Sequence, residues 1–153
     1  MSPARLLFLW HRLGGTPPGR WLFSHLIGLA VPYSGSIGAR VTSLEPGRAT
    51  VTLRDRRRVR NHLGSIHAVA LVNLAELSSG MAMLTALEPG VRGIVTNIRV
   101  QYHKKARGRL TATGTAAPPQ VGHPMEAAAH AEVRDLAGDV VAEATVVWRL
   151  DQR

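Results

Sequence analysis

The chain has 153 residues, of which 45% are hydrophobic, so it is long enough to bury a core without covalent cross-links. It contains no cysteine, which excludes disulfides, thiolate metal ligands and a cysteine nucleophile. Its 19 basic and 10 acidic residues give a formal net charge of +9, a surplus that attracts polyanions. We expect a single domain that spans residues 1–153.

Two short apolar segments come first. The segment "ARLLFLWHR" ends in two basic residues, and "WLFSHLIGLAVP" is interrupted by His25 and Gly28 and closed by Pro32. Both fall short of the roughly 20 apolar residues that a membrane-spanning helix needs, so we expect no transmembrane segment and take the cytoplasm as the default location. The breaker "GGTPPG" separates them. We predict two short amphipathic helices within residues 1–33, which lie on the domain or, as the alternative, on a membrane surface.

From residue 36 onward the hydrophobic period changes to two. Ile37, Ala39 and Val41 alternate with polar residues, "EPGR" has the composition of a turn, and the alternation resumes in "ATVTLR". This pattern predicts a β-hairpin.

The densest cationic run, "RDRRRVR" at residues 54–60, follows the hairpin. It has no interleaved aromatic residue for base stacking and matches no motif of nucleic-acid recognition. Nucleic acid is therefore not the expected partner. A solvated loop and a rim that faces another polyanion are the two alternatives.

Residues 66–87 form a long segment that is apolar on nearly every side, which predicts a buried helix that "EPG" ends. Its polar residues Asn73, Glu76 and Ser79 are three positions apart and share one narrow stripe. A carboxylate is costly to bury in apolar surroundings, and its pKa should shift upward, toward the range of a general base or nucleophile. The alternative is an acid that is solvated or ion-paired.

Four more alternating segments follow, at residues 94–102, 110–116, 125–133 and 140–150. In the first, the residues expected to share one face are Ile94, Thr96, Ile98, Val100 and Tyr102. Small inward residues in the last two would let the helix lie close to a curved sheet; these are Ala127, Ala129, Ala142 and Ala144. The turn "DLAGD" joins them. The pattern predicts an α+β fold, with about six antiparallel strands wrapped around one long helix.

The element order and the segment "NHLGSIHAVALVNLAELSSGMAML" resemble the hotdog-fold acyl-thioester hydrolases, those of the phenylacetate pathway in particular. They resemble still more a largely uncharacterised thioesterase-like hotdog family, from the N-terminal helices through "VPYSGSIGARV" to "QYHKKARG". The resemblance implies a hotdog core at residues 36–150. It also implies an acyl-CoA or acyl-carrier-protein thioester as the substrate, and a homodimer, with a dimer of dimers left open.

Carried over by position, the resemblance implies that Asn61 and His67 grip the thioester, with Gly64 and Ser65 in the same loop. The backbone N–H of Ala68 would polarise the carbonyl oxygen of the thioester. A helix N-terminus suits this role, because its N–H groups are unpaired and carry the positive end of the helix dipole. A turn or capping role for Asn61 and a structural hydrogen bond for His67 are the alternatives.

The resemblance also implies that Glu76 is the nucleophile or general base. Many relatives have aspartate there, and many have two glycines where this chain has Ala68 and Val69. Eight residues separate Ala68 from Glu76, which is about 12 Å along a helix, too far for both to act on one carbonyl. If both take part, each site combines two subunits, which predicts a two-fold dimer.

Two further groups are candidates for substrate contacts. Thr96 and Asn97 are placed to orient water or Glu76, although the polarity of a sheet surface explains them as well. The segment "YHKKARGR", with Lys104, Lys105 and Arg107, is expected to meet the phosphates of coenzyme A. A charged strand edge that discourages aggregation is its alternative, and "RDRRRVR" is a second candidate for the phosphate contacts.

The sequence predicts no metal site and no cofactor, because the seven histidines are dispersed and none pairs with a carboxylate at ligand spacing. It also lacks a G-x-S-x-G elbow and a phosphate-binding glycine loop. The expected function is hydrolysis of an acyl thioester by water and a carboxylate. A catalytically silent protein that holds an acyl-CoA or a lipid in the same groove is the alternative.

Overall fold

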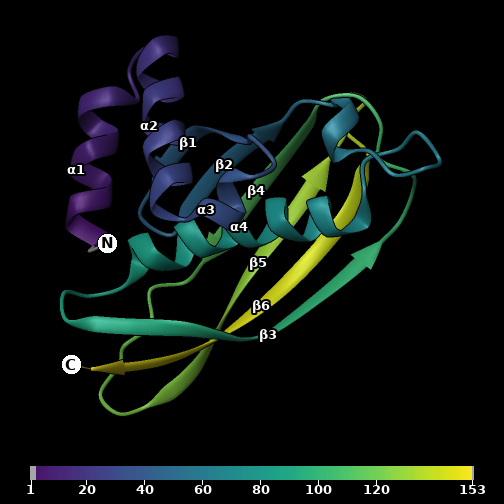
Figure 1. Ribbon diagram of the computed structural model, residues 1–153. Helices are drawn as coiled ribbons and strands as arrows, with labels where there is room; N and C mark the ends of the chain where they lie inside the picture. The colour runs from purple at the N-terminus through teal and green to yellow at the C-terminus, as the bar shows by residue number, and fades with distance from the viewer. Residues whose placement is uncertain (1–2, 153) are drawn as a thin grey trace.

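The computed structural model describes residues 3–152, and its first part is helical (Figure 1). Helix α1 (Pro3–Leu13) and helix α2 (Pro17–Ala30) confirm the two predicted N-terminal helices. Helix α2 begins cleanly because Thr16 Oγ1 accepts a hydrogen bond from the N–H of Gly19 and a proline stands at the first helical position. A third helix, α3 (Pro32–Gly35), was not predicted, since four residues are too few to show a period.

The predicted hairpin consists of β1 (Arg40–Glu45) and β2 (Arg48–Leu53), which pair antiparallel. Strand β1 begins later than the alternation suggested. Gly38 has a positive φ of 63°, which ends the extended pattern and leaves Ile37 buried ahead of the strand. The arginine-rich run after β2 contains one short 3₁₀ turn, η1 (Arg57–Val59).

The long helix α4 (Ala68–Ala86) lies across one face of the sheet (Figure 1). It is the one helix of residues 3–152 that is long and apolar enough to cross a membrane, but 67% of that stretch is buried inside the protein. Its buried hydroxyls are satisfied within the helix: Ser79 Oγ donates to the carbonyl of Ala75 at 2.8 Å, and Thr85 Oγ1 donates to that of Met81 at 2.9 Å. Packing against the sheet therefore accounts for the apolar character of α4.

The other four strands are β3 (Val91–Tyr102), β4 (Leu110–Ala116), β5 (Met125–Arg134) and β6 (Val140–Gln152). All six strands form one antiparallel sheet in the order β1-β2-β4-β5-β6-β3. Helices α1 to α3 lie at the end of the sheet that holds β1, and β3 is the opposite edge (Figure 1). This curved sheet around a central helix confirms the predicted α+β hotdog fold.

Strand β3 corrects one prediction of side-chain direction. The pairing with β6 shifts between Val95 and Asn97, which marks a β-bulge at Thr96. Because the extra residue reverses the alternation, Ile94 lies opposite Arg149 and is exposed, whereas Ile98 pairs with the buried Val146. Ile94 and Ile98 therefore do not share a face, and a strict period of two could not reveal the inserted residue.

The helix and the sheet approach each other closely at Gly114 of β4. A Cβ atom at this position would overlap the backbone carbonyl of Ser78 and the amide nitrogen of Ser79. The predicted inward alanines Ala129 and Ala144 are also buried beneath α4. Small residues on the inner face thus let α4 pack against the sheet, and one of them is a glycine that the alternation pattern did not single out.

Gly114→Ala is expected to lower the free energy of unfolding by about 1–3 kcal/mol, because the added methyl group can be accommodated only if α4 moves away from the sheet. Gly122→Ala is the matched control, since a Cβ there meets no atom within 4 Å. Denaturant unfolding followed by circular dichroism measures both. Equal stability of the two variants would contradict the close approach.

Candidate functional site

The polar stripe on α4 contains one side chain without a partner. Asn73 is buried and its Nδ2 donates to the backbone carbonyl of Tyr33 at 3.0 Å, which ties α4 to α3. Ser79 is bonded within the helix. The carboxylate of Glu76 makes no hydrogen bond and no ion pair with any described residue. Burial raises the pKa of Glu76 above its usual value. A half-buried, unpaired acid with a raised pKa is suited to accept a proton.

Gly80, one turn after Glu76, leaves space beside this carboxylate. A Cβ at position 80 would lie 3.3 Å from Glu76 Oε1 and 3.4 Å from Cζ2 of Trp148, so both groups border the same small volume. Trp148 comes from β6, and its indole Nε1 is buried without a hydrogen-bond partner. An unpaired buried N–H group is uncommon, because it loses its hydration without compensation. Neither Trp148 nor Gly80 was predicted at the site, because no sequence pattern links them to Glu76.

The entrance of α4 presents hydrogen-bond donors. His67 is the N-cap, and its Nδ1 accepts a hydrogen bond from the N–H of Val69 at 3.1 Å. This bond requires a neutral ring with its proton on Nε2, which is then available to an outside acceptor. The N–H of Ala68 has no acceptor in residues 3–152, as expected in the first turn of a helix. His67 and Ala68 are both exposed.

The loop before α4 is held by the side chain of Asn61. Its Oδ1 accepts hydrogen bonds from the N–H of Leu63 at 2.9 Å and from both the N–H and the hydroxyl of Ser65 at 3.2 Å. Gly64 allows the turn with a φ of 68°. The Nδ2 of Asn61 has no partner in the described part of the chain. The structure therefore brings Asn61, Gly64 and Ser65 together beside His67, and gives Ser65 a buried, structural position.

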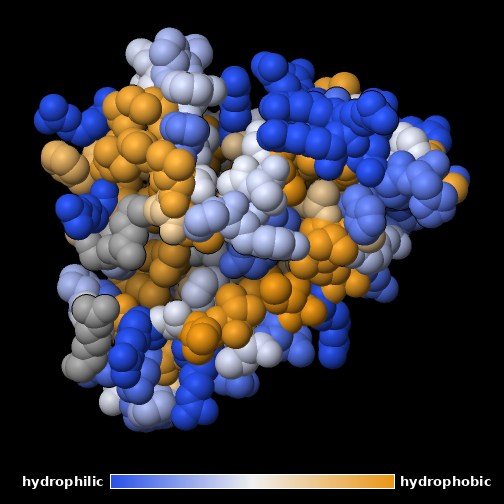
Figure 2. Space-filling model, viewed as in Figure 1, coloured by the Kyte–Doolittle hydropathy of each residue, from blue (hydrophilic) through white to orange (hydrophobic). Residues whose placement is uncertain are grey.

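The two ends of the candidate site are far apart within one chain. Ala68 and Glu76 lie on the same unbroken helix, so eight residues separate them by about 12 Å. The surface near them is apolar: Val69 is 51% exposed, and Ile98 and Tyr102 of the edge strand β3 are 39% and 47% exposed. Tyr102 also donates from its hydroxyl to the carbonyl of Ala68 at 3.2 Å. Figure 2 shows apolar side chains along the part of this face that holds α4 and β3.

The remaining predicted residues lie near the loop or on the edge strand. The carbonyl of Ala106 accepts from the N–H of Ile66 at 2.8 Å, which places the segment of Lys105 and Arg107 beside the entrance of α4. Lys104, in contrast, pairs with Asp135 at 2.7 Å and Asp139 at 2.6 Å.

On the edge strand, Thr96 Oγ1 donates to the carbonyl of Val147 at 3.3 Å. Asn97 is exposed opposite Val147. Neither residue is hydrogen-bonded to Glu76.

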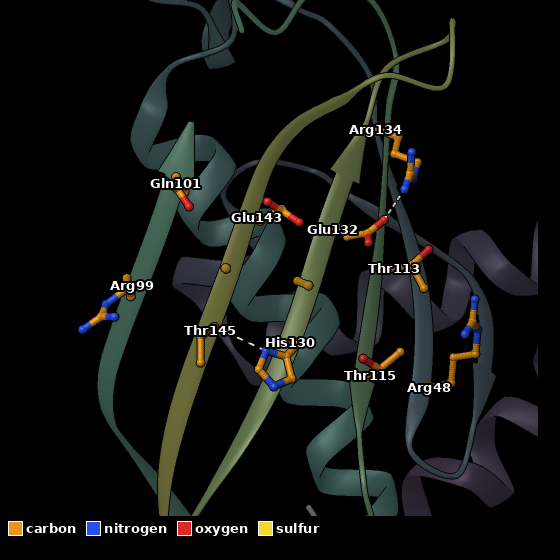
Figure 3. A pocket seen from close by; sticks show the side chains of 12 residues that line it. Arg48, Arg99, Gln101, Thr113, Thr115, His130, Glu132, Arg134, Glu143 and Thr145 are labelled. Atoms are coloured by element: carbon orange, nitrogen blue, oxygen red, sulfur yellow. Dashed lines mark hydrogen bonds and ion pairs between the residues drawn. The ribbon is translucent and has the colours of Figure 1, made fainter. Parts of the chain in front are cut away.

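A hollow of about 580 Å³ lies elsewhere (Figure 3). Outward side chains of β2, β3, β4, β5 and β6 line it, including the ion pair between Glu132 and Arg134 and the contact of Thr145 Oγ1 with His130 Nδ1 at 3.3 Å. This is the polar outer face of the sheet, and α4 packs on the other face (Figure 3). It contains none of the predicted site residues. Nowhere in residues 3–152 do three His, Asp or Glu side chains gather as a metal ion would need.

Fold and site together describe a hotdog-fold protein with one unpaired acid on its central helix. A family model matches residues 19–150, and the chain belongs to that family, a domain of unknown function called DUF4442. No curated protein matches the chain.

Solved structures share the fold. A structural-genomics target is 28% identical, with 99% of each chain covered and a TM-score of 0.83. A Pseudomonas aeruginosa protein described as a probable thioesterase is 24% identical, covering 85% of this chain and 93% of its own, with a TM-score of 0.76. The phenylacetic acid degradation protein of Thermus thermophilus is 23% identical, covering 77% and 97%, with a TM-score of 0.67.

Proposed function

We propose that the protein hydrolyses acyl thioesters of coenzyme A or of an acyl carrier protein. The observation that carries this proposal is the unpaired, half-buried carboxylate of Glu76 on a helix whose other residues are mostly apolar. The description of the similar Pseudomonas aeruginosa protein as a probable thioesterase adds support.

Each residue has a role in the proposed reaction. Glu76 takes a proton from water as the water oxygen bonds to the thioester carbonyl carbon. The N–H of Ala68 stabilises the negative charge that develops on the carbonyl oxygen. The carbon–sulfur bond then breaks, and the thiolate takes up the proton. In the alternative route the Glu76 carboxylate attacks the carbonyl carbon and the thiolate leaves; water then hydrolyses the mixed anhydride, which regenerates Glu76 and releases a carboxylic acid whose proton passes to the thiolate. The Nε2 of His67 and the Nδ2 of Asn61 are the free donors that would position the thioester.

A homodimer would complete the site. Strand β3 is an open edge of 12 residues that exposes Ile98 and Tyr102. The unpaired backbone N–H and C=O groups of such an edge can pair with a strand of a second chain. Within one chain Ala68 and Glu76 are about 12 Å apart, too far for both to act on one carbonyl. Two-fold pairing along β3 and α4 would instead bring Glu76 of one subunit toward Ala68 of the other. Lys105 and Arg107, beside the entrance of α4, would then face the phosphates of the substrate.

Release of free thiol from a panel of short, aryl and long-chain acyl-CoA esters tests the proposal. The chain has no cysteine, so a thiol reagent has no protein background. We expect turnover of at least one ester, and the preferred acyl group would indicate the length of acyl chain that the site accepts. No turnover of any CoA or carrier-protein ester would overturn the proposal.

A protein that holds a thioester without cleaving it is the second candidate. The N–H of Val69 already donates to His67 Nδ1, so it is not free to bind the carbonyl oxygen of a thioester. Of these two adjacent amides, only the N–H of Ala68 is then available as an oxyanion donor. Tight binding of acyl-CoA with no product release, unchanged in Glu76→Gln, would favour this candidate.

A further inference from the structure

The arginine-rich run after β2 contains far more positive charge than its neighbours neutralise. Arg60 pairs with Asp55 at 2.5 Å, and Asp55 also accepts from the N–H of Gly108 at 2.8 Å. Arg54, Arg56 and Arg58 form no ion pair with any residue of the described range. Figure 2 shows a strongly hydrophilic patch over this segment, on the same face as the apolar surface of α1 and α2.

Two of these guanidinium groups converge on one point of the backbone. A Cβ at Gly38 would overlap Nη2 of Arg58 and would lie 3.7 Å from Nη1 of Arg56. Burial, and then the positive charges of Arg58, Arg54 and Arg40, lower the pKa of Arg56. Side chains of like charge are held together here although they repel each other. A bound anion would remove that repulsion.

The convergent arginines border a hollow of about 480 Å³ between α2, α3 and the start of β1. Arg40, Arg56 and Arg58 line it together with Trp21 and His25 of α2. The rings of Trp21 and His25 are stacked, with centroids 5.4 Å apart and an angle of 2° between their planes, and Trp21 is 50% exposed. The lining of this hollow thus combines a flat aromatic surface with three arginines.

A second hollow, of about 190 Å³, continues the first, because Gly38, Arg40 and Arg56 line both. It adds Arg54 and Arg109 to the set of cations. No aspartate or glutamate lines either hollow. Paired arginines bind phosphate oxygens through two parallel N–H donors, and an aromatic face stacks on a nucleobase.

We propose that this hollow binds a nucleotide, with its phosphates on Arg40, Arg56 and Arg58 and its base against Trp21. Its position fits a ligand that continues toward the candidate active site. The carbonyl of Val59, the residue after Arg58, accepts from the N–H of His67 at 2.8 Å, so the segment that carries Arg56 and Arg58 also contacts the entrance of α4. If the proposed thioester hydrolysis is correct, the nucleotide is the one at the end of coenzyme A; a free nucleotide has the same chemistry.

Isothermal titration calorimetry of the full chain with coenzyme A, ADP and inorganic phosphate tests this proposal directly. We expect the wild type to bind coenzyme A or ADP, and the double variant Arg56→Gln, Arg58→Gln to bind it at least about tenfold more weakly. Trp21→Ala should weaken the binding of the nucleotides but not that of inorganic phosphate. Tighter binding of coenzyme A than of ADP would indicate that the bound nucleotide is the one in coenzyme A and not a free nucleotide.

Arg57→Gln is the matched control, because Arg57 carries the same charge in the same run but lines neither hollow. Its affinity should equal that of the wild type. If Arg57→Gln lost as much affinity as the double variant, net charge alone would explain the effect and the proposal would be overturned. A wild type that binds none of the three ligands would overturn it as well. If the double variant does not fold, as judged by circular dichroism, Arg58→Gln and Trp21→Ala carry the same comparison. The binding experiment does not require turnover, so its failure is distinct from a failure of thioester hydrolysis.

Discussion

Glu76→Gln is expected to lower kcat for thioester hydrolysis by about a hundredfold to ten-thousandfold, the usual contribution of a positioned proton acceptor. Glutamine keeps the shape of the side chain beside Gly80 but cannot accept a proton from water. The binding of the substrate should change little, since glutamine has nearly the same size as glutamate and the proposed positioning donors on Asn61 and His67 are unaltered. Steady-state kinetics on the best acyl-CoA ester measures kcat and KM separately.

The same substitution should make the folded protein more stable at neutral pH. Because burial raises the pKa of Glu76, the folded state binds this proton more tightly than the unfolded state does. The stability that this proton contributes is complete below the unfolded pKa and is lost as the pH rises through the folded pKa. Glutamine does not titrate, so the variant avoids that loss. The free energy of unfolding should differ by about 1.4 kcal/mol for each unit by which the folded pKa of Glu76 exceeds its unfolded pKa. Thermal unfolding of both proteins across the acid range should show the gap widening with pH.

The pH dependence of wild-type kcat follows from the same group. Activity should fall as the pH drops through the raised pKa, because the carboxylate is then protonated. Glu88→Gln is the control: Glu88 is an exposed acid just beyond the end of α4, and its loss should leave both activity and stability unchanged. A Glu76→Gln variant that retains wild-type kcat would remove the carboxylate from the mechanism.

The fold was predictable because hydrophobic period is a strong local signal. Alternation in β4, β5 and β6 and the continuous apolar run of α4 each span enough residues to define an element. Two features were not predictable. The bulge at Thr96 is set by pairing between β3 and β6, and the close approach at Gly114 is set by packing between distant segments. Both features depend on contacts between segments that are distant in the chain, so the sequence of one segment cannot predict them.

The candidate site was predictable only in part. The spacing of Asn73 and Glu76 on one stripe and the upward shift of the Glu76 pKa follow from local sequence, and the structure agrees with both. The roles of Asn61, His67, Ala68 and Glu76 in catalysis stay predictions.

The unpaired Trp148 Nε1 and the convergence of Arg56 and Arg58 at Gly38 were missed. Each joins residues that are far apart in the chain. The density of arginine in "RDRRRVR" was the one available signal.

Ala68→Pro is expected to lower the rate of hydrolysis strongly while preserving the helix. Proline is favoured at the first position of a helix and removes only the N–H group. His67 has φ −64° and ψ 140°, the extended conformation that a following proline requires. Loss of the oxyanion donor should lower kcat by about a hundredfold to a thousandfold. Circular dichroism checks that α4 still forms.

The two inactive variants, Glu76→Gln and Ala68→Pro, decide together whether the site is shared between subunits. If it is shared, a mixed dimer has one site with both defects and one site with none. Random exchange of equal amounts should then restore about a quarter of the wild-type active sites, because half of the dimers are mixed and each has one intact site.

If Ala68 and Glu76 acted within one chain, every site in the mixture would keep a defect and no activity would return. Separation of the mixed dimer by two different affinity tags should raise the recovery to about half of the wild-type sites, since every dimer is then mixed. Activity in that fraction requires both a dimer and a composite site, because a monomer can never contain both intact groups. An inactive mixed dimer would contradict the inference that Ala68 and Glu76 of different subunits form one site, even if Glu76 proves essential.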